Sequence, residues 1–79
     1  MLDPKIDTLL MICEMKNFTK AAKKLSLTQP AVSHHINQLE KELDVKIFNR
    51  KRGQLSLTSE GETIVMYAKR MKSIYAKMK

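Results

Sequence analysis

Residues 28–43 hold the polar side chains whose types and spacing best suit binding chemistry. Four of them would share one side of a helix: Gln29, Ser33, His34 and Asn37. A glutamine amide can pair in a bidentate manner with adenine, and a serine hydroxyl can bond to bases of either type. Residues 15–39 contain no Asp or Glu, so this helix would not repel a polyanion. The pattern predicts a helix that contacts base edges in the major groove of DNA.

Other residues of the same segment would assist this contact. Pro30 and Ala31 offer apolar surface to a thymine methyl group, and a helix that starts at Thr28 presents free amides suited to a phosphate. His34 could donate to guanine or phosphate, whereas His35 falls beside the buried stripe and is interpreted as a packed residue. Neighbouring histidines diverge on a helix and no further ligand cluster exists, so no metal site is expected. The alternative is that the whole set is an ordinary solvated first turn.

The rest of this segment indicates how the helix is held. Thr28 is expected to cap it, because a threonine oxygen can accept from a first-turn amide, and Pro30 needs no hydrogen bond there. An apolar stripe would face inward: Val32, Ile36, Leu39 and Leu43. Asp44 is expected to end the helix in a left-handed turn.

Two further helices are expected before this one. Asp3 and Pro4 would start the first, since Asp can cap a helix and Pro loses no hydrogen bond at the first position. Its buried stripe would be Ile6, Leu9, Leu10 and Cys13. Phe18 and Thr19 are expected to act as the staple and the cap of a short second helix. Residues 26–27 would then form the turn into the polar helix.

A small hairpin is expected after Asp44. Two alternating runs, residues 47–50 and 55–57, flank a turn that contains Gly53, which predicts a β-hairpin wing over residues 48–57. Its basic side chains are Arg50, Lys51 and Arg52. Beside a groove-reading helix, such a wing would contact phosphates or a narrow minor groove, although a solvated hairpin is the simpler alternative.

The last segment, residues 58–79, is expected to form one long helix of roughly 30 Å. Thr58 or Ser59 would cap it, and Ser59 and Glu62 have the spacing of a capping box. Five apolar residues repeat every four and three positions, and Tyr67 and Ile74 lie beside them: Ile64, Ala68, Met71, Tyr75 and Met78. Because this period approaches that of a coiled coil, the stripe predicts a seam with a second copy of the chain.

Composition limits the possible functions. The chain has 79 residues, enough for one small domain, and a net charge of +7 that favours nucleic acid or an anionic membrane as partner. No nucleophile and base, phosphate loop or metal cluster can be assembled, so neither an enzyme nor a cofactor is expected. One cysteine forms no internal disulfide, and no apolar run reaches the roughly 20 residues that span a bilayer. A cytoplasmic protein is expected.

Residues 18–61 closely resemble the amino-terminal DNA-binding domain of LysR-type bacterial transcriptional regulators. The resemblance rests on four motifs in the family's order and spacing: FTKAAKKL, SLTQPAVSHHINQLEKEL, IFNRKR and LTSEG. It implies a mostly α winged helix-turn-helix domain, a three-helix core with a short β-hairpin wing, in residues 1–57. A linker and dimerisation helix would follow over residues 58–79, and a small-molecule effector would bind only through a larger domain absent from this sequence.

By matching position, the resemblance assigns base reading to the start of the recognition helix: Gln29, Pro30, Ala31, Ser33 and His34. It assigns contacts with the flanking backbone or minor groove to Arg50 and Arg52. Two positions depart from the family: Asp44 stands where Gly is usual, and His34 stands where a longer polar or basic side chain is common. The second departure leaves the base preference open.

These inferences predict a homodimer that places two recognition helices, residues 28–43, in successive major grooves of an inverted repeat in double-stranded DNA. One alternative is a winged-helix or nucleoid protein that binds DNA without sequence preference. Another is a basic amphipathic module that binds a membrane surface or a coiled-coil partner. The second alternative leaves the polar helix unexplained.

Overall fold

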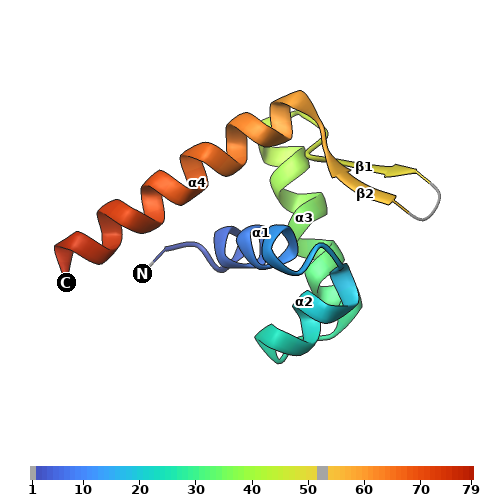
Figure 1. Ribbon diagram of the computed structural model, residues 1–79, viewed down its shortest axis with the longest axis horizontal. Coiled ribbons are helices and arrows are strands. Elements are labelled where there is room, and N and C mark those ends of the chain that lie inside the picture. The colour runs from blue at the N-terminus through green and yellow to red at the C-terminus, as the bar shows by residue number, and fades with distance from the viewer. Residues whose placement is uncertain (1, 52–53) are drawn as a thin grey trace.

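The computed structural model describes residues 2–51 and 54–79 of the chain (Figure 1). The elements follow in this order: α1 (Pro4–Met15), α2 (Phe18–Leu25), α3 (Gln29–Leu43), β1 (Phe48–Lys51), β2 (Gln54–Leu57) and α4 (Ser59–Met78). The strands are antiparallel, with Phe48 opposite Leu57 and Lys51 opposite Gln54. The hairpin projects to one side of the α-helical core and α4 extends to the other (Figure 1). The predicted mostly helical fold with a β-hairpin wing is confirmed.

Capping side chains mark where α1 and α3 begin. The Asp3 carboxylate accepts a hydrogen bond from the Lys5 amide at 2.9 Å, and the Thr28 hydroxyl accepts one from the Ala31 amide at 3.2 Å. Each oxygen satisfies a first-turn amide that has no partner within the helix. Asp44 ends α3 in the left-handed conformation, with φ 54°. These three predictions from the sequence are confirmed.

The predicted start of α2 is wrong. Asn17, not Thr19, caps this helix, because its side-chain oxygen accepts a hydrogen bond from the Lys20 amide at 2.8 Å. Phe18 is therefore the first helical residue and not a staple ahead of the cap. The tight turn that joins α1 to α2 places Lys16 in the left-handed region, with φ 55°.

The core lies where α1, α3 and the chain leading into the wing meet. Its largest fully buried apolar side chains are Leu9, Ile12, Val32, Ile36 and Ile47. Ala21 and Ala22 of α2 are buried as well, and their small side chains let α2 approach both helices closely. Burial of each large apolar side chain contributes about 1.5–3 kcal/mol, so these contacts fix how α3 is held.

Leu43 was expected on the inward stripe of α3, and this expectation is wrong. Its side chain is 48% exposed. It borders a surface groove together with Ile64 and Tyr67 of α4. The apolar period of α3 therefore continues one turn beyond the point where the core covers the helix.

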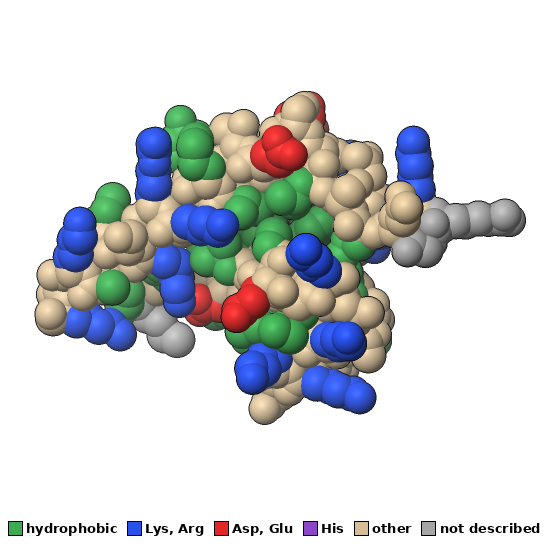
Figure 2. All heavy atoms as spheres, in the orientation of Figure 1, with side chains coloured by type: hydrophobic (Ala, Val, Ile, Leu, Met, Phe, Trp, Pro, Cys, Tyr) green, Lys and Arg blue, Asp and Glu red, His purple; other side chains and the backbone are tan. Residues whose placement is uncertain are grey.

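The first half of α4 belongs to the same core as α1. Gly61, Val65 and Ala68 are buried, and apolar side chains gather between α4 and α1 on the face drawn in Figure 2. Ala68 is 0% exposed, so its predicted place on a surface between two chains is wrong. Val65 fills a core position that the predicted stripe omitted. Further along, Lys72 Nζ lies 2.6 Å from Asp7 Oδ1 of α1, which ties the helix to the domain.

Thr58 caps α4, since its hydroxyl oxygen accepts a hydrogen bond from the Gly61 amide at 2.9 Å. The predicted capping box of Ser59 and Glu62 is not formed, because the Ser59 hydroxyl donates to the Glu60 carboxylate at 3.0 Å. The Glu60 backbone amide and this hydroxyl both lower the pKa of the Glu60 carboxyl. Neither α4 nor any other helix of the described residues has the length and apolar character to cross a membrane.

Candidate nucleic-acid interface

The amino-terminal part of α3 carries the residues expected to read bases, and it is open to solvent. The exposed members are Thr28, Gln29, Pro30, His34 and Asn37, and the partly exposed members are Ala31 and Ser33. The Thr28 cap leaves other first-turn amides free at this helix end, which suits an anionic group. The structure thus places these predicted residues together, on Thr28 and the solvent-accessible side of α3.

Two of these residues are joined to each other. The Gln29 side-chain nitrogen donates to the Ser33 hydroxyl oxygen at 2.9 Å, one helical turn away. This bond orients the Gln29 amide and leaves its oxygen and one N–H free. A free carbonyl oxygen beside a free N–H is the pairing that adenine N6 and N7 require. The residue types were predictable from the sequence, but this bond was not.

The two adjacent histidines have different surroundings. His34 is exposed, whereas His35 Nδ1 lies 2.8 Å from the hydroxyl oxygen of Thr8, a residue of α1 that is 1% exposed. The contact ties α3 to α1, which confirms His35 as a packed residue. Across the described parts of the chain, no group of three or more His, Cys, Asp or Glu side chains is arranged to hold a metal ion.

The wing presents Arg50 and Lys51 from β1, and both side chains are exposed. Arg52, the third basic residue expected in the wing, lies outside the described residues. The Arg50 guanidinium lies over the Phe18 ring, 4.6 Å from its centroid. Phe18 in turn meets the buried Phe48 ring edge to face, with centroids 5.6 Å apart. A cation over an aromatic face is attracted to it, so the start of α2 holds Arg50 in place.

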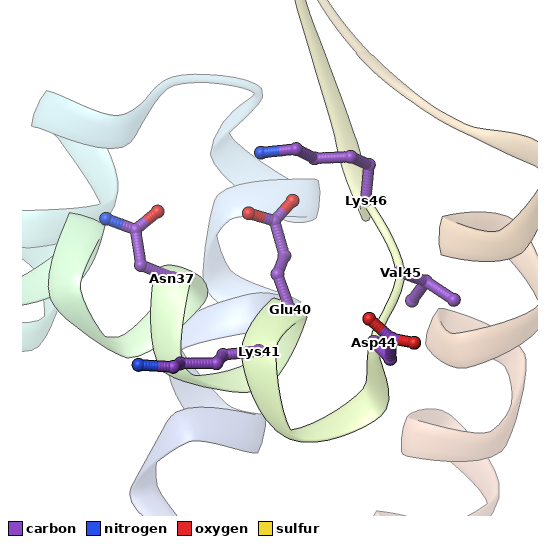
Figure 3. A pocket seen from close by; sticks show the side chains of 6 residues that line it. All are labelled: Asn37, Glu40, Lys41, Asp44, Val45 and Lys46. Atoms are coloured by element: carbon purple, nitrogen blue, oxygen red, sulfur yellow. The ribbon is translucent and has the colours of Figure 1, made fainter.

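Glu40 of α3 links the recognition helix to the wing, and no motif in the sequence indicates this link. Its carboxylate accepts from the Ile47 amide at 2.8 Å and from the Phe48 amide at 3.5 Å. Figure 3 shows Glu40 between Asn37 and Lys46, in a surface hollow beside the chain that leads into β1. A related hollow is lined by the same three residues together with Arg50. This carboxylate therefore lies among the residues expected to meet DNA.

Charged and thiol groups of α1 serve the packing of the domain. Lys5 Nζ lies 3.0 Å from Asp3 Oδ2 and 3.2 Å from Glu42 Oε1, so it joins the start of α1 to the last turn of α3. These carboxylates raise the pKa of Lys5, and the Lys5 amide and ammonium lower the pKa of Asp3. Burial raises the pKa of the Cys13 thiol, which packs against the core as expected.

A second surface, here called the α4 face, is apolar. Its exposed members are Tyr67, Met71, Ile74 and Met78. Ile64 and Tyr75, also expected in the dimer seam, are partly buried within the chain. Tyr67 and Met71 border a groove that is completed by Leu2 and Ile6 near the start of α1 and by Leu39 and Leu43 of α3. An apolar surface of this kind on a small domain is typical of an interaction site.

Comparison with known proteins places the chain in a family. Residues 5–62 match the model of the bacterial regulatory helix-turn-helix proteins, lysR family. The HTH-type transcriptional regulator CysL of Bacillus subtilis is 40% identical over 74 residues, which cover 94% of this chain and 25% of that protein. The chain thus spans about a quarter of the length of the curated relatives it matches.

Solved structures give the same result. A LysR-family transcriptional regulator from Eggerthella lenta is 41% identical, with a TM-score of 0.75 over 86% of this chain and 96% of that one. The BenM DBD in complex with catB site 1 DNA is 32% identical, with a TM-score of 0.91 over 99% of this chain and 84% of that one. The match over residues 5–62 covers α2, α3 and both strands in full and all of α1 after Pro4. The chain therefore belongs to the LysR family of bacterial regulatory helix-turn-helix proteins.

Proposed function

We propose that this chain is the DNA-binding part of a transcriptional regulator and that it binds double-stranded DNA with sequence preference. The start of α3 enters the major groove, where Gln29, Ser33 and His34 contact base edges. The wing lies on the flanking backbone or minor groove through Arg50 and Lys51. Such a protein is a regulator and not an enzyme, and its DNA binding needs no cofactor in this segment. Its target, bacterial chromosomal DNA, implies a cytoplasmic location.

The observation that carries this proposal is the exposed, acid-free face at the start of α3. A binder that used charge alone would present mainly Lys and Arg, whereas this face presents an oriented glutamine amide and a serine hydroxyl. The BenM DBD, whose structure is so similar, was crystallised on DNA. Both facts favour sequence-specific binding over a nucleoid protein without base preference.

We also propose that two copies of the chain pair through the α4 face. The exposed side chains of Tyr67, Met71 and Ile74 are large and apolar, and they recur at the spacing of a helix seam. Two paired copies would present two recognition helices about one turn of DNA apart, on an inverted repeat. In this account the basic residues of α4 remain in solvent, and no membrane is bound.

Selection of random duplex DNA by the purified chain tests the proposed function. Enrichment of an inverted repeat supports both base reading and pairing of two copies. Enrichment of a single half-site supports base reading and argues against pairing. If no sequence is enriched while binding falls steeply with salt, the chain is a non-specific DNA binder. Binding to anionic vesicles without DNA binding would favour the membrane-surface module.

A further inference from the structure

The backbone of Ile47 is the point where three elements meet. Its amide donates to Glu40 of α3 at 2.8 Å, and its carbonyl oxygen accepts from the Thr58 amide at 2.9 Å, at the start of α4. Its side chain is fully buried in the core, and Phe48, the first residue of β1, follows directly. Whatever holds the Ile47 backbone therefore also sets where the wing begins.

Glu40 is the acceptor that α3 supplies at this point. A carboxylate forms stronger hydrogen bonds to backbone amides than a neutral oxygen does. The Glu40 side chain reaches from α3 to the Ile47 and Phe48 amides. It therefore holds the start of β1 against α3. Without this acceptor the Ile47 amide would lose its partner, which is costly for a group next to the core.

The location of Glu40 makes its negative charge unusual. The carboxylate lies in the hollows lined by Asn37, Lys46 and Arg50, on the side of the molecule expected to face DNA phosphates. A surface acid at this position would weaken DNA binding by repulsion. Glu40 is only partly exposed and its oxygen is turned to backbone amides, so its function is structural and concerns the wing.

We propose that Glu40 is a positioning residue for DNA binding, which acts through the Ile47 and Phe48 amides to set the wing at a fixed angle to α3. This inference rests on the proposed function. When the wing is held in this way, Arg50 and Lys51 reach the phosphate backbone of the DNA while the start of α3 lies in the major groove. With the wing released, the contacts of α3 with bases remain and the contribution of the wing is lost.

Two substitutions distinguish the effect of the length of the Glu40 side chain from the effect of its charge. Glu40→Asp keeps the charge but is one methylene shorter, so the carboxylate withdraws from the Ile47 amide. Glu40→Gln keeps the length and an acceptor oxygen but loses the charge. We expect Glu40→Asp to weaken binding to the selected site by about tenfold, because the charge-assisted contacts of the wing with DNA phosphates are no longer held in place. We expect Glu40→Gln to stay within about threefold of the wild type, since a neutral acceptor still holds the amide.

Glu62→Gln removes one negative charge from an exposed position of α4 and should change binding only slightly. A surface-charge role for Glu40 would instead leave Glu40→Asp like the wild type and make Glu40→Gln bind more tightly, and this pattern would overturn the proposal. Adding Lys51→Ala to Glu40→Asp should cost less than it costs in the wild type, because the released wing already contributes little. If Lys51→Ala lowered DNA affinity equally in Glu40→Asp and in the wild type, the proposal would also be overturned.

Hydrogen exchange of the Ile47 amide, measured by NMR, keeps the test valid if a variant loses stability. The amide should exchange slowly in the wild type and at least tenfold faster in Glu40→Asp, relative to a core amide such as that of Ile36. An Ile47 amide that exchanges equally in both chains would contradict the proposal even without DNA. If the wild-type chain itself shows no sequence preference, the proposed function fails, and the exchange result still decides whether Glu40 holds the wing.

Discussion

Gly61 of α4 lies directly against the carbonyl group of Ile47. A Cβ atom at position 61 would lie 2.1 Å from the Ile47 oxygen and 2.9 Å from its carbon, well inside van der Waals contact. The missing side chain therefore lets the first turn of α4 approach the chain that leads into the wing. This approach also allows Thr58 to bond to the Ile47 carbonyl and cap α4 at the same time.

Gly61→Ala is therefore expected to destabilise the domain, although alanine is the better helix former. The added methyl group meets backbone, which cannot rotate away, so we expect a loss of about 1–3 kcal/mol in the free energy of unfolding. Urea denaturation followed by circular dichroism measures it. Ser73→Ala, on the exposed part of the same helix, should stay within about 0.5 kcal/mol of the wild type. Equal stability of the Gly61 variant would show that α4 can shift away from Ile47.

Lys51→Ala is expected to weaken binding to all DNA sequences alike. A lysine that neutralises one phosphate releases about one counterion, so the slope of log affinity against log salt should fall by about one unit. The measurement is a salt titration on a selected duplex and on a scrambled one. Lys77→Ala, in the last turn of α4, removes the same charge away from the proposed interface and should leave the slope nearly unchanged. An unchanged slope in the Lys51 variant would remove this residue from the phosphate contacts.

Met71→Asp is expected to weaken pairing of two copies and DNA affinity together. It places a charge in the α4 face, where Met71 is 41% exposed and borders the apolar groove. Burying an unpaired carboxylate between two chains is strongly unfavourable, so dimerisation should weaken at least about tenfold. Sedimentation measures the association.

Ser73→Asp is the matched control for this change, because it adds the same charge on the opposite side of the same helix. It should leave association close to that of the wild type. A Met71 variant that still pairs like the wild type would sink the assignment of the α4 face as the contact between copies. The variant's helix content must first match that of the wild type by circular dichroism.

The sequence predicts the helices well where their signals are local. Asp3 and Thr28 carry their own acceptors for first-turn amides, so α1 and α3 begin where expected. At α2 the signal is ambiguous, because Asn17 and Thr19 are both good caps and lie two residues apart. In the structure the Asn17 side chain accepts from the Lys20 amide, and the Phe18 ring packs between Arg50 and Phe48.

Periodicity identifies which side of a helix is apolar but not what covers it. Leu43 continues the stripe of α3 beyond the core, and Ala68 lies on the α4 stripe yet is covered by its own chain. The contacts of Glu40 with the Ile47 and Phe48 amides leave no repeating pattern in the sequence. They depend on how the chain folds back after Asp44, which local preferences do not determine.

Reading of bases by the start of α3 is tested most directly by comparing the DNA motifs selected by the wild type and by Gln29→Ala. We expect the variant to retain the inverted repeat but lose preference at one base pair of each half-site, by about 1–3 kcal/mol. Gln38→Ala, at an exposed position further along α3 that is not among the proposed base contacts, should select the wild-type motif. If Gln29→Ala selects the wild-type motif with equal preference at every position, Gln29 reads no base and this account of α3 is contradicted.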